Sequence, residues 1–472
     1  MLVSRRTWRL VLTMAVLMAA AGVSARLGAE PERAPEPRPR PSTTVAGARQ
    51  APERPNVLIV VTDDQRGDAM WVMPKTKRQF EESGVRFTRA FATTPLCCPS
   101  RASIFTGMYA HNHGVKTNAD SRELEPRRTL QFHLRRRGYR TAIFGKYLNG
   151  WRTAPPHFDE WAIVDTHLYR GPWNVNGEPT DVGRYSTTFI REHALRFLRG
   201  RERDDERPWL LILTPQAPHP PFTPEERYAG APVAAARPNP AQLEQDVSDK
   251  PQYIQSAVAP TDEAIAEVRN AQLRTLMSVD DLVATTFAEL AALGEERNTL
   301  AFFLSDNGYT WGEHRLLGNA VSKNSPYAQS VRIPLFMRWP ARLPGARVDE
   351  RLAANIDIAP TIFDATGVDP GVAPDGRSLL RRWHRPYLLL ERWRTNHAST
   401  IPAWASLWTG TEQLVEYSDA GSVIARTYYD LVEDPWQLDN LLADENPVND
   451  ARARHLQAEL RRVRHCSGSQ CP

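Results

Sequence analysis

Four uninterrupted apolar runs mark the chain, and each one leads into polar or ionisable residues. They cover residues 57–61, 141–144, 209–213 and 300–304. Runs of this length without polar alternation are typical of strands buried on both faces, as in a parallel sheet covered by helices. Such sheets bind their ligands at the carboxyl ends of the strands. The pattern therefore predicts a chemical site where these four runs end.

Helical periodicity occupies segments between the runs. Residues 270–293 carry apolar side chains at helical spacing and lead into the fourth run, and residues 124–137 show a weaker pattern of the same kind. Strands that alternate with helices indicate an α/β fold with a large, mostly parallel central sheet flanked by helices. The loops 151–185 and 220–265 are rich in proline and aperiodic, so we expect them to shape the substrate site.

The pattern changes in the last fifth of the chain. Alternating segments at 386–392 and 413–417, followed by a helical stretch at 450–463, predict a small antiparallel sheet with a final helix. The sequence thus divides into a catalytic domain over residues 55–384 and a smaller C-terminal subdomain over residues 385–472.

The first residues have the composition of an export signal. Residues 1–25 combine a basic start, an apolar run and a small-residue site at Val23-Ser24-Ala25. The apolar run is too short for a comfortable membrane span, although an uncleaved anchor is the alternative. Arg5-Arg6 resembles a twin-arginine signal. Residues 26–54 are rich in proline, glutamate and arginine and predict a disordered spacer. We therefore expect a secreted or cell-surface protein with no stable membrane span.

Composition and cysteine content agree with this interpretation. A chain of 472 residues, 41% of them hydrophobic, is long enough for one large and one smaller domain. Three of the four formal positive charges come from arginines of the export segment, so the remainder carries no nucleic-acid footprint. Cys466 and Cys471 are spaced for a terminal disulfide; a free pair, or a metal site with His465, is the alternative.

A turn that leads into a short helix is predicted around Cys97. Pro99 suits the first helical position, and Gly107 suits the stop. Cys97 then lies just before the helix N-terminus, where free N–H groups and the macrodipole favour an anion. Arg101 adds a cation whose fork fits a tetrahedral oxyanion. We infer an anion pocket that contains a thiol; a buried cysteine pair and a thiol-protease nucleophile are the alternatives.

Acidic and amide side chains follow two of the apolar runs. Asp63 and Asp64 come after the first run, and Asp306 and Asn307 come after the fourth. Adjacent carboxylates repel each other unless a cation lies between them. An all-oxygen donor set selects Ca²⁺ or Mg²⁺ and argues against zinc. For either pair alone, turn residues that cap helices are the alternative.

The string Cys97-Cys98-Pro99-Ser100-Arg101, with Thr106-Gly107 downstream, resembles the sulfatase signature. In that family, which has an alkaline-phosphatase-like fold, the first cysteine is oxidised enzymatically to formylglycine, whose hydrated aldehyde is the nucleophile. The resemblance implies that Cys97 is this residue and that a formylglycine-generating enzyme is a partner during maturation. It also implies that Ca²⁺, rather than Mg²⁺, is held by Asp63, Asp64, Cys97, Asp306 and Asn307.

Further sulfatase landmarks provide the cations. Lys146 follows a glycine after the second run, Lys323 begins a Lys-x-x-x-Tyr motif, and His219 matches a Pro-His-x-Pro motif. The arginine and the lysines would neutralise sulfate oxygens, and His219 or Lys323 would protonate the leaving alcohol. The catalytic set implied by the resemblance is Cys97, Arg101, Lys146, His219 and Lys323.

One position departs from the pattern of many sulfatases. They have a histidine two residues after the lysine of the Gly-Lys motif, whereas this chain has Leu148, followed by Asn149. This variant, together with the doubled cysteine and the Tyr-x-His-Asn-His string at 109–113, resembles the N-acetylglucosamine-6-sulfatase and heparan endosulfatase branch. Asn149, His111 and His113 are candidates to take over the contact of the missing histidine.

The resemblance implies hydrolysis of a sulfate monoester, of a sulfated sugar or an aryl alcohol. One alternative keeps the fold and changes the ester, giving a phosphonate or phosphodiester hydrolase. A second alternative is a catalytically silent protein that binds sulfated glycans through an unmodified Cys97.

Overall fold

The computed structural model describes residues 54–165, 171–201, 207–318, 321–394, 399–444 and 446–472. The predicted export signal, and the predicted spacer except for its last residue, lie outside this part of the chain. Within it, none of the helices has the length and apolar character that a bilayer crossing requires.

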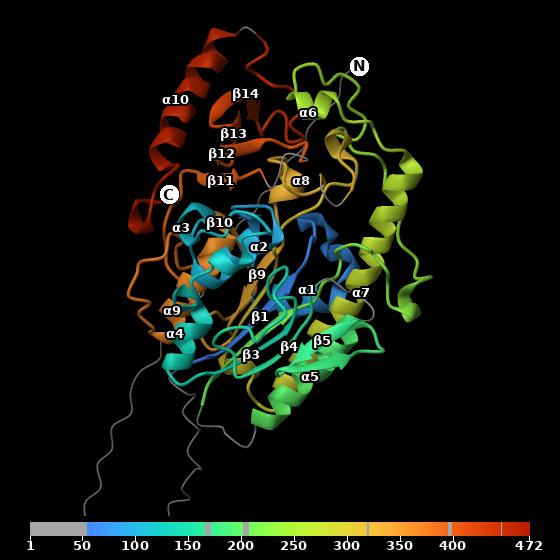
Figure 1. The fold of residues 1–472 in the computed structure, drawn as a ribbon, viewed down its shortest axis with the longest axis vertical. Helices are drawn as coiled ribbons and strands as arrows, with labels where there is room; N and C mark the ends of the chain where they lie inside the picture. The colour runs from blue at the N-terminus through green and yellow to red at the C-terminus, as the bar shows by residue number, and fades with distance from the viewer. Residues whose placement is uncertain (1–53, 166–170, 202–206, 319–320, 395–398, 445) are drawn as a thin grey trace, which may run out of the picture. The chain divides into compact units, whose positions relative to one another are not determined.

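Strands and helices alternate along most of the described chain (Figure 1). The strands are β1 (Asn56–Thr62), β2 (Val85–Phe91), β3 (Arg140–Gly145), β4 (Glu160–Ile163), β5 (Pro172–Val175), β6 (Glu178–Asp181), β7 (Trp209–Thr214), β8 (Thr299–Ser305), β9 (Leu335–Arg338), β10 (Arg347–Ala354), β11 (Leu388–Arg392), β12 (Ala403–Trp408), β13 (Glu412–Asp419) and β14 (Ser422–Asp430). The α-helices are α1 (Pro74–Glu81), α2 (Cys97–Thr106), α3 (Ala110–His113), α4 (Leu130–Arg136), α5 (Ser186–Arg201), α6 (Gln252–Gln255), α7 (Asp262–Ala292), α8 (Ala328–Val331), α9 (Ile358–Thr366) and α10 (Pro447–Val463). Short 3-10 turns are η1 (Gly67–Val72), η2 (Ser121–Glu123), η3 (Pro126–Arg128), η4 (Glu226–Tyr228), η5 (Glu296–Asn298), η6 (Glu313–Arg315), η7 (Asn355–Asp357) and η8 (Gly468–Gln470).

The large sheet has the strand order β10-β2-β9-β8-β1-β7-β3-β4-β5-β6. The four predicted runs form its centre, because β8, β1, β7 and β3 are adjacent and pair in parallel. In this sheet, β9 and β5 run opposite to their neighbours. The predicted α/β fold with a mostly parallel sheet is therefore confirmed, and the carboxyl ends of its central strands lie at one edge.

Strand β1 shows why its sequence carries no polar alternation. Val57, Ile59 and Val61 pack into the core on one face of the sheet, and Leu58 and Val60 pack into the core on the other. Helices α2, α4 and α9 cover the first face, and α1, α5 and α7 cover the second (Figure 1). Because both faces are buried, every position from Val57 to Val61 is apolar.

Several boundaries differ from the sequence prediction. Helix α7 begins earlier than predicted because the hydroxyl of Thr261 accepts from the backbone N–H of Ala264 and caps it. The predicted crossover at 124–137 forms only the short helix α4 after the turns η2 and η3. The aperiodic loop 151–185 contributes three short strands, β4, β5 and β6, to the sheet edge.

The C-terminal region forms a separate sheet in the order β11-β12-β13-β14, with all pairs antiparallel. Helix α10 follows it, as the sequence predicts. Cys466 and Cys471 form a disulfide bond. The indole N–H of Trp404, on β12, donates to the carbonyl of Asn324 in a loop of the large domain, at 2.7 Å. The small sheet therefore supports the segment that carries Lys323.

Candidate active site

The central strands bring their polar ends together in one buried cluster. Asp63 and Asp64 follow β1, and Asp306 and Asn307 follow β8. The N–H of Asp306 donates to the carbonyl of Thr62 at 3.0 Å, which continues the pairing of the two strands beyond their ends. Asp64 has a φ of 70°, a left-handed backbone that costs energy in a residue with a side chain. The loop accepts this strain and places both carboxylates at the sheet edge.

Helix α2 presents its first residue to the same cluster. It begins at Cys97, two residues before the predicted start, because Leu96 is extended and its carbonyl accepts from the N–H of Ser100 at 3.0 Å. Pro99 then occupies a first-turn position, where an absent N–H leaves no partner unsatisfied. Gly107 ends the helix with a left-handed φ of 72°, as predicted.

Cys97 lies between an acid and a lysine at the centre of the cluster. Its Sγ is 3.4 Å from Oδ1 of Asp63 and 3.4 Å from Nζ of Lys323. Burial and the charge of Asp63 raise the pKa of the Cys97 thiol well above its ordinary value. The unmodified thiol therefore stays protonated at neutral pH, which argues against a thiol-protease nucleophile.

Arg101 and Lys146 bind the first of these acids from two directions. Nζ of Lys146 is 2.5 Å from Oδ2 of Asp63, and Nη2 of Arg101 is 3.4 Å from the same oxygen. Arg101 also donates from Nε to Oδ2 of Asp306 at 2.8 Å and from Nη1 to the carbonyl of Lys146 at 2.7 Å. Burial would raise the pKa of Asp63, but Lys146 and the neighbouring cations hold it well below its ordinary value.

Lys323 binds the second acid. Its Nζ lies 2.9 Å and 2.8 Å from the two carboxylate oxygens of Asp64. Burial would lower the pKa of Lys323, but Asp64 and the surrounding acids raise it well above its ordinary value. Lys323 is therefore a fixed positive charge beside Cys97.

His219 is the partly exposed member of the set. Its Nδ1 lies 2.7 Å from the carbonyl of Pro220, and its Nε2 lies 4.0 Å from Oδ2 of Asp64. A protonated Nδ1 donates to that carbonyl and leaves Nε2 directed to the site. Burial and the charge of Lys323 lower the pKa of His219. Its side chain is 19% exposed, whereas those of Asp63 and Asp64 are fully buried.

The donor set fits a hard divalent cation. Carboxylate oxygens of Asp63, Asp64 and Asp306 lie within 4.8 Å of one another. Burial and the charge of Asp63 raise the pKa of Asp306 to about 7, the mark of crowded carboxylates. Oδ1 of Asn307 is buried and accepts no hydrogen bond from the described residues, while its amide donates to Asp64 at 2.7 Å. A cation would satisfy that oxygen and relieve the repulsion.

The candidates for the missing histidine have other partners. Leu148 is buried in the core, and the N–H of Asn149 lies 3.0 Å from Sγ of Cys98. His113 lies against the hydroxyl of Ser103 at 3.1 Å, and burial lowers its pKa to about 3. His111 contacts Glu391 at 2.9 Å and the carbonyl of Cys466 at 2.9 Å. The two histidines thus hold α3 in place, and neither contacts the cluster in the structure.

Two residues support the site and were not singled out from the sequence. The hydroxyl of Ser100 donates to the carbonyl of Asp306, and the amide of Asn355 donates to that hydroxyl at 2.8 Å. Asn355 in turn accepts from the N–H and hydroxyl of Thr93, both at 3.1 Å. This chain of bonds fixes the loop after β8 against α2. The sequence signal was the position of Ser100 within the Cys97 motif.

The structure thus brings all the predicted site residues to one place. The contacts join nine residues into one cluster: Cys97, Arg101, Lys146, His219, Lys323, Asp63, Asp64, Asp306 and Asn307.

Comparisons with known proteins agree with this site. The family model "Sulfatase" matches residues 55–368, and the model "N-sulphoglucosamine sulphohydrolase, C-terminal" matches residues 312–466. The N-acetylglucosamine-6-sulfatase of Capra hircus is 29% identical over 492 residues, covering 90% of this chain and 86% of that protein. The extracellular sulfatase SULF-1 homologue of Drosophila melanogaster is 33% identical over 349 residues, covering 69% of this chain and 31% of that protein. This chain spans about half or less of the extracellular sulfatases that it matches.

A solved structure has the same fold. It shows a protein in complex with its substrate D-glucosamine-2-N,6-O-disulfate, and its TM-score against this chain is 0.76. The two are 22% identical, and the alignment covers 86% of this chain and 97% of that one.

Proposed function

Because this chain belongs to the sulfatase family, we propose that it hydrolyses the sulfate monoester of a sulfated sugar. The observation that carries this proposal is the meeting of Cys97 with three buried cations and three buried carboxylates at one sheet edge. The cations suit the oxygens of a sulfate group, and the carboxylates suit a divalent metal ion. A site built only for structural ion pairs has no use for a thiol between Asp63 and Lys323.

Two groups outside the twenty amino acids complete the proposal. A hydrated formylglycine at residue 97 would supply one hydroxyl for attack on the sulfur and a second whose ionisation would release sulfate, a route that an unmodified cysteine or serine lacks. Ca²⁺ would be held by Asp63, Asp64, Asp306 and Asn307 with residue 97, and it would supply positive charge for the nucleophile and the sulfate. A formylglycine-generating enzyme is the maturation partner that this route requires.

The chain's own side chains have distinct tasks in this proposal. Arg101 and Lys146 are held rigidly by their acids, so they are preorganised to stabilise charge on the sulfate oxygens in the transition state. Lys323 has a raised pKa and acts as a third fixed charge. His219 is partly exposed, and its Nδ1 stays bonded to the carbonyl of Pro220, so Nε2 of the protonated ring can give its proton to the leaving alcohol oxygen. Because its pKa is lowered, the protonated ring is a stronger acid than a free imidazolium. We therefore assign the proton donation to His219.

The substrate we propose is a glucosamine unit sulfated at its 6-oxygen. Support comes from the relative named N-acetylglucosamine-6-sulfatase and from the neighbour bound to a 6-O-sulfated glucosamine. The relatives named extracellular sulfatases support export of this chain, which the composition of residues 1–25 also predicts.

Kinetics on four compounds test the proposal. The protein, co-expressed with a formylglycine-generating enzyme and supplied with Ca²⁺, is assayed on N-acetylglucosamine 6-sulfate, N-sulfoglucosamine, an aryl sulfate and an aryl phosphonate ester. We expect the highest kcat/KM on the 6-sulfate. A preference for the phosphonate ester would favour the alternative hydrolase of the same fold. No turnover of any ester, with retained binding of sulfated sugars, would favour the silent glycan-binding protein.

A further inference from the structure

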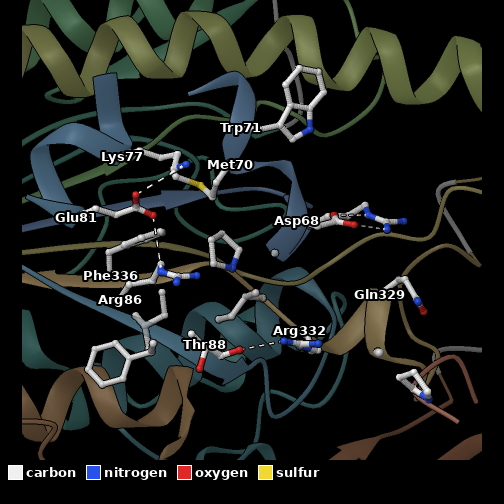
Figure 2. A pocket seen from close by; sticks show the side chains of 18 of the residues that line it. Asp68, Met70, Trp71, Lys77, Glu81, Arg86, Thr88, Gln329, Arg332 and Phe336 are labelled. Atoms are coloured by element: carbon white, nitrogen blue, oxygen red, sulfur yellow. Dashed lines mark hydrogen bonds and ion pairs between the residues drawn. The ribbon is translucent and has the colours of Figure 1, made fainter. Parts of the chain in front are cut away.

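The protein has a cavity whose lining is separate from the catalytic cluster. It is a cavity of about 630 Å³, bordered by η1, α1, β2, α8, β9 and the segment Pro435-Trp436 (Figure 2). Ligand pockets in proteins span about 300–1,000 Å³, so one or two sugar units fit such a volume. None of the proposed catalytic or metal-binding side chains lines it.

The walls of this cavity carry more cations than acids. Four cationic side chains face two carboxylates there: Arg66, Lys77, Arg86 and Arg332 against Asp68 and Glu81. Arg66 and Asp68 neutralise each other through two bonds of 2.8 Å. Glu81 is shared at 3.8 Å by Lys77 and Arg86, too long for a hydrogen bond to either. The cations of these walls therefore outnumber the carboxylates, and Arg332 lies close enough to Asp68 for their charges to interact.

Within the described part of the chain, Arg332 forms no ion pair, although the charge of Asp68 acts on it from a longer distance. Its Nη2 donates to the carbonyl of Thr88 at 2.9 Å, and no carboxylate of the described residues lies within 4.0 Å of it. The side chain is exposed, so its remaining donors are directed to solvent or to a ligand. A guanidinium with open donors is the group that binds a sulfate or carboxylate in a planar fork.

Two tryptophans border the same space. Trp71 is 44% exposed and projects from η1, and Trp436, which also lines the cavity, is half-buried. Large apolar rings at the rim of a polar pocket mark a binding surface. Beside Arg332, Oε1 of Gln329 is buried and accepts no hydrogen bond from the described residues. It offers an acceptor for a hydroxyl.

From this combination we propose that the cavity binds a sulfated sugar unit of an oligosaccharide, away from the ester that is cleaved. Aromatic rings suit the apolar faces of sugar rings, Gln329 suits a hydroxyl, and the excess of cations, with Arg332 among them, suits a sulfate group. A neutral sugar chain would leave these cations uncompensated. The identity of the ligand rests on the proposed function, since it extends the same sulfated substrate beyond one residue.

The cavity is connected to the catalytic loops through the backbone. Arg66 follows Asp64 by two residues, and the N–H of Gly308, next to Asn307, donates to the carbonyl of Ser330 at 2.8 Å. Ser330 adjoins Gln329 in α8. The lining of the cavity and the loops of the catalytic cluster are therefore neighbouring parts of the same backbone.

Binding and turnover of matched sugars test the proposal. The double variant Trp71→Ala/Arg332→Gln is compared with the parent and with Arg199→Gln, which removes an exposed cation of α5 far from these walls in sequence. Calorimetry in a Cys97→Ala background uses a sulfated hexasaccharide prepared from heparin and its desulfated counterpart. We expect the Kd for the sulfated hexasaccharide to rise about tenfold in the double variant and not in Arg199→Gln.

Activity on N-acetylglucosamine 6-sulfate separates the two proposals. With residue 97 intact, we expect the double variant to keep the parent's kcat/KM on this monosaccharide, and unfolding temperatures verify that it is folded. Equal hexasaccharide Kd values in parent and double variant, or equal binding of the desulfated chain by the parent, would overturn the cavity proposal. A parent that binds as expected and cleaves no sulfate ester would overturn the proposed function instead.

Discussion

Asp357 and Arg385 form a buried ion pair that contrasts with the catalytic cluster. Their side chains are fully buried, and the guanidinium grips both carboxylate oxygens at 2.8 Å and 2.7 Å. The backbone N–H groups of Ala354 and Arg377 also donate to the carboxylate oxygens of Asp357, each at 2.8 Å. Every acceptor position of this acid is therefore in use, as a structural pair requires.

The catalytic cluster is built the opposite way. Its carboxylates crowd one another, the pKa of Asp306 is raised to about 7, and Oδ1 of Asn307 has no donor among the described residues. Burial in this form costs stability unless another group is bound. The comparison teaches that a closed charge network needs no further group, while the open network has the unsatisfied groups expected of the proposed metal and substrate site.

The largest effect should come from removing one charge of the open network. We expect Asp306→Asn to lower kcat on N-acetylglucosamine 6-sulfate by about 10²–10³-fold or more, because the metal site loses a carboxylate. The amide oxygen can still accept from Arg101, while the bond from the N–H of Asp64 is lost. Because the substitution also removes the repulsion between carboxylates, the unfolding temperature in metal-free buffer should change little. Steady-state kinetics and calorimetry measure both. Full activity would place the metal ion elsewhere.

Substitution in the closed Asp357–Arg385 pair should lower the free energy of unfolding and leave catalysis unchanged. Arg385→Met leaves Asp357 buried without its cation, and we expect a loss of about 3–5 kcal/mol in the free energy of unfolding. Below its melting range, the folded variant should keep the parent's kcat. Arg381→Ala is the matched control, because its pair with Asp364 is exposed on the arginine side and its loss should change the free energy of unfolding little. A similar loss in both variants would contradict the distinction.

Metal removal should affect only the open network. With Ca²⁺ at about a hundred times its Kd, we expect the free energy of unfolding to exceed that of the chelated protein by about 2.7 kcal/mol. Asp306→Asn should lose most of this difference, and Arg381→Ala should keep it. Denaturant titrations with and without chelator provide the measurement. A calcium effect of unchanged size in Asp306→Asn would mean that the ion binds at another position.

The smallest expected effect on stability concerns His111. Both of its ring nitrogens have partners, as the groups of the Asp357–Arg385 pair do. Burial would lower its pKa, but the hydrogen bond and charge of Glu391 raise it. Because the pKa is higher in the folded state, the protonated ring stabilises the fold. This contribution is complete below the pKa of the unfolded state, about 6.5, and is lost as pH rises through the pKa of the folded state. We expect His111→Gln to be less stable than the parent by about 1–2 kcal/mol at pH 5.5.

The pH dependence of this difference is the decisive part. It should shrink as the pH is raised to 9, because His111 is then neutral in the folded and unfolded parent alike. Urea titrations across this range measure it, and a gap independent of pH would show that the charged form of His111 adds nothing.

The sequence predicted those parts of the fold in which a local pattern decides the structure. The four apolar runs became β1, β3, β7 and β8 because no other element buries such runs on both faces. Their order in the sheet then followed from parallel crossovers, which explains why Asp63 and Asp306 meet. Motif residues on loops, such as Lys323 and His219, could be placed only through the resemblance to sulfatases.

The remaining features depend on tertiary contacts. Strands β4, β5 and β6 have four residues each and are defined by pairing at the sheet edge, so the proline-rich loop 151–185 gave no periodic signal for them. The cavity joins Trp71 to Trp436, two residues from distant parts of the chain that no local pattern relates. The support of Asp306 by Asn355 through Ser100 is a long-range network of the same kind.

Mass spectrometry of residue 97 tests the central claim most directly. Trypsin releases it in the peptide 90–101, between Arg89 and Arg101. In preparations that cleave a sulfate ester, we predict an aldehyde at position 97 and an unmodified thiol at Cys98, with the aldehyde fraction proportional to kcat across batches. Full sulfatase activity in a preparation whose Cys97 is entirely an intact thiol would contradict the account.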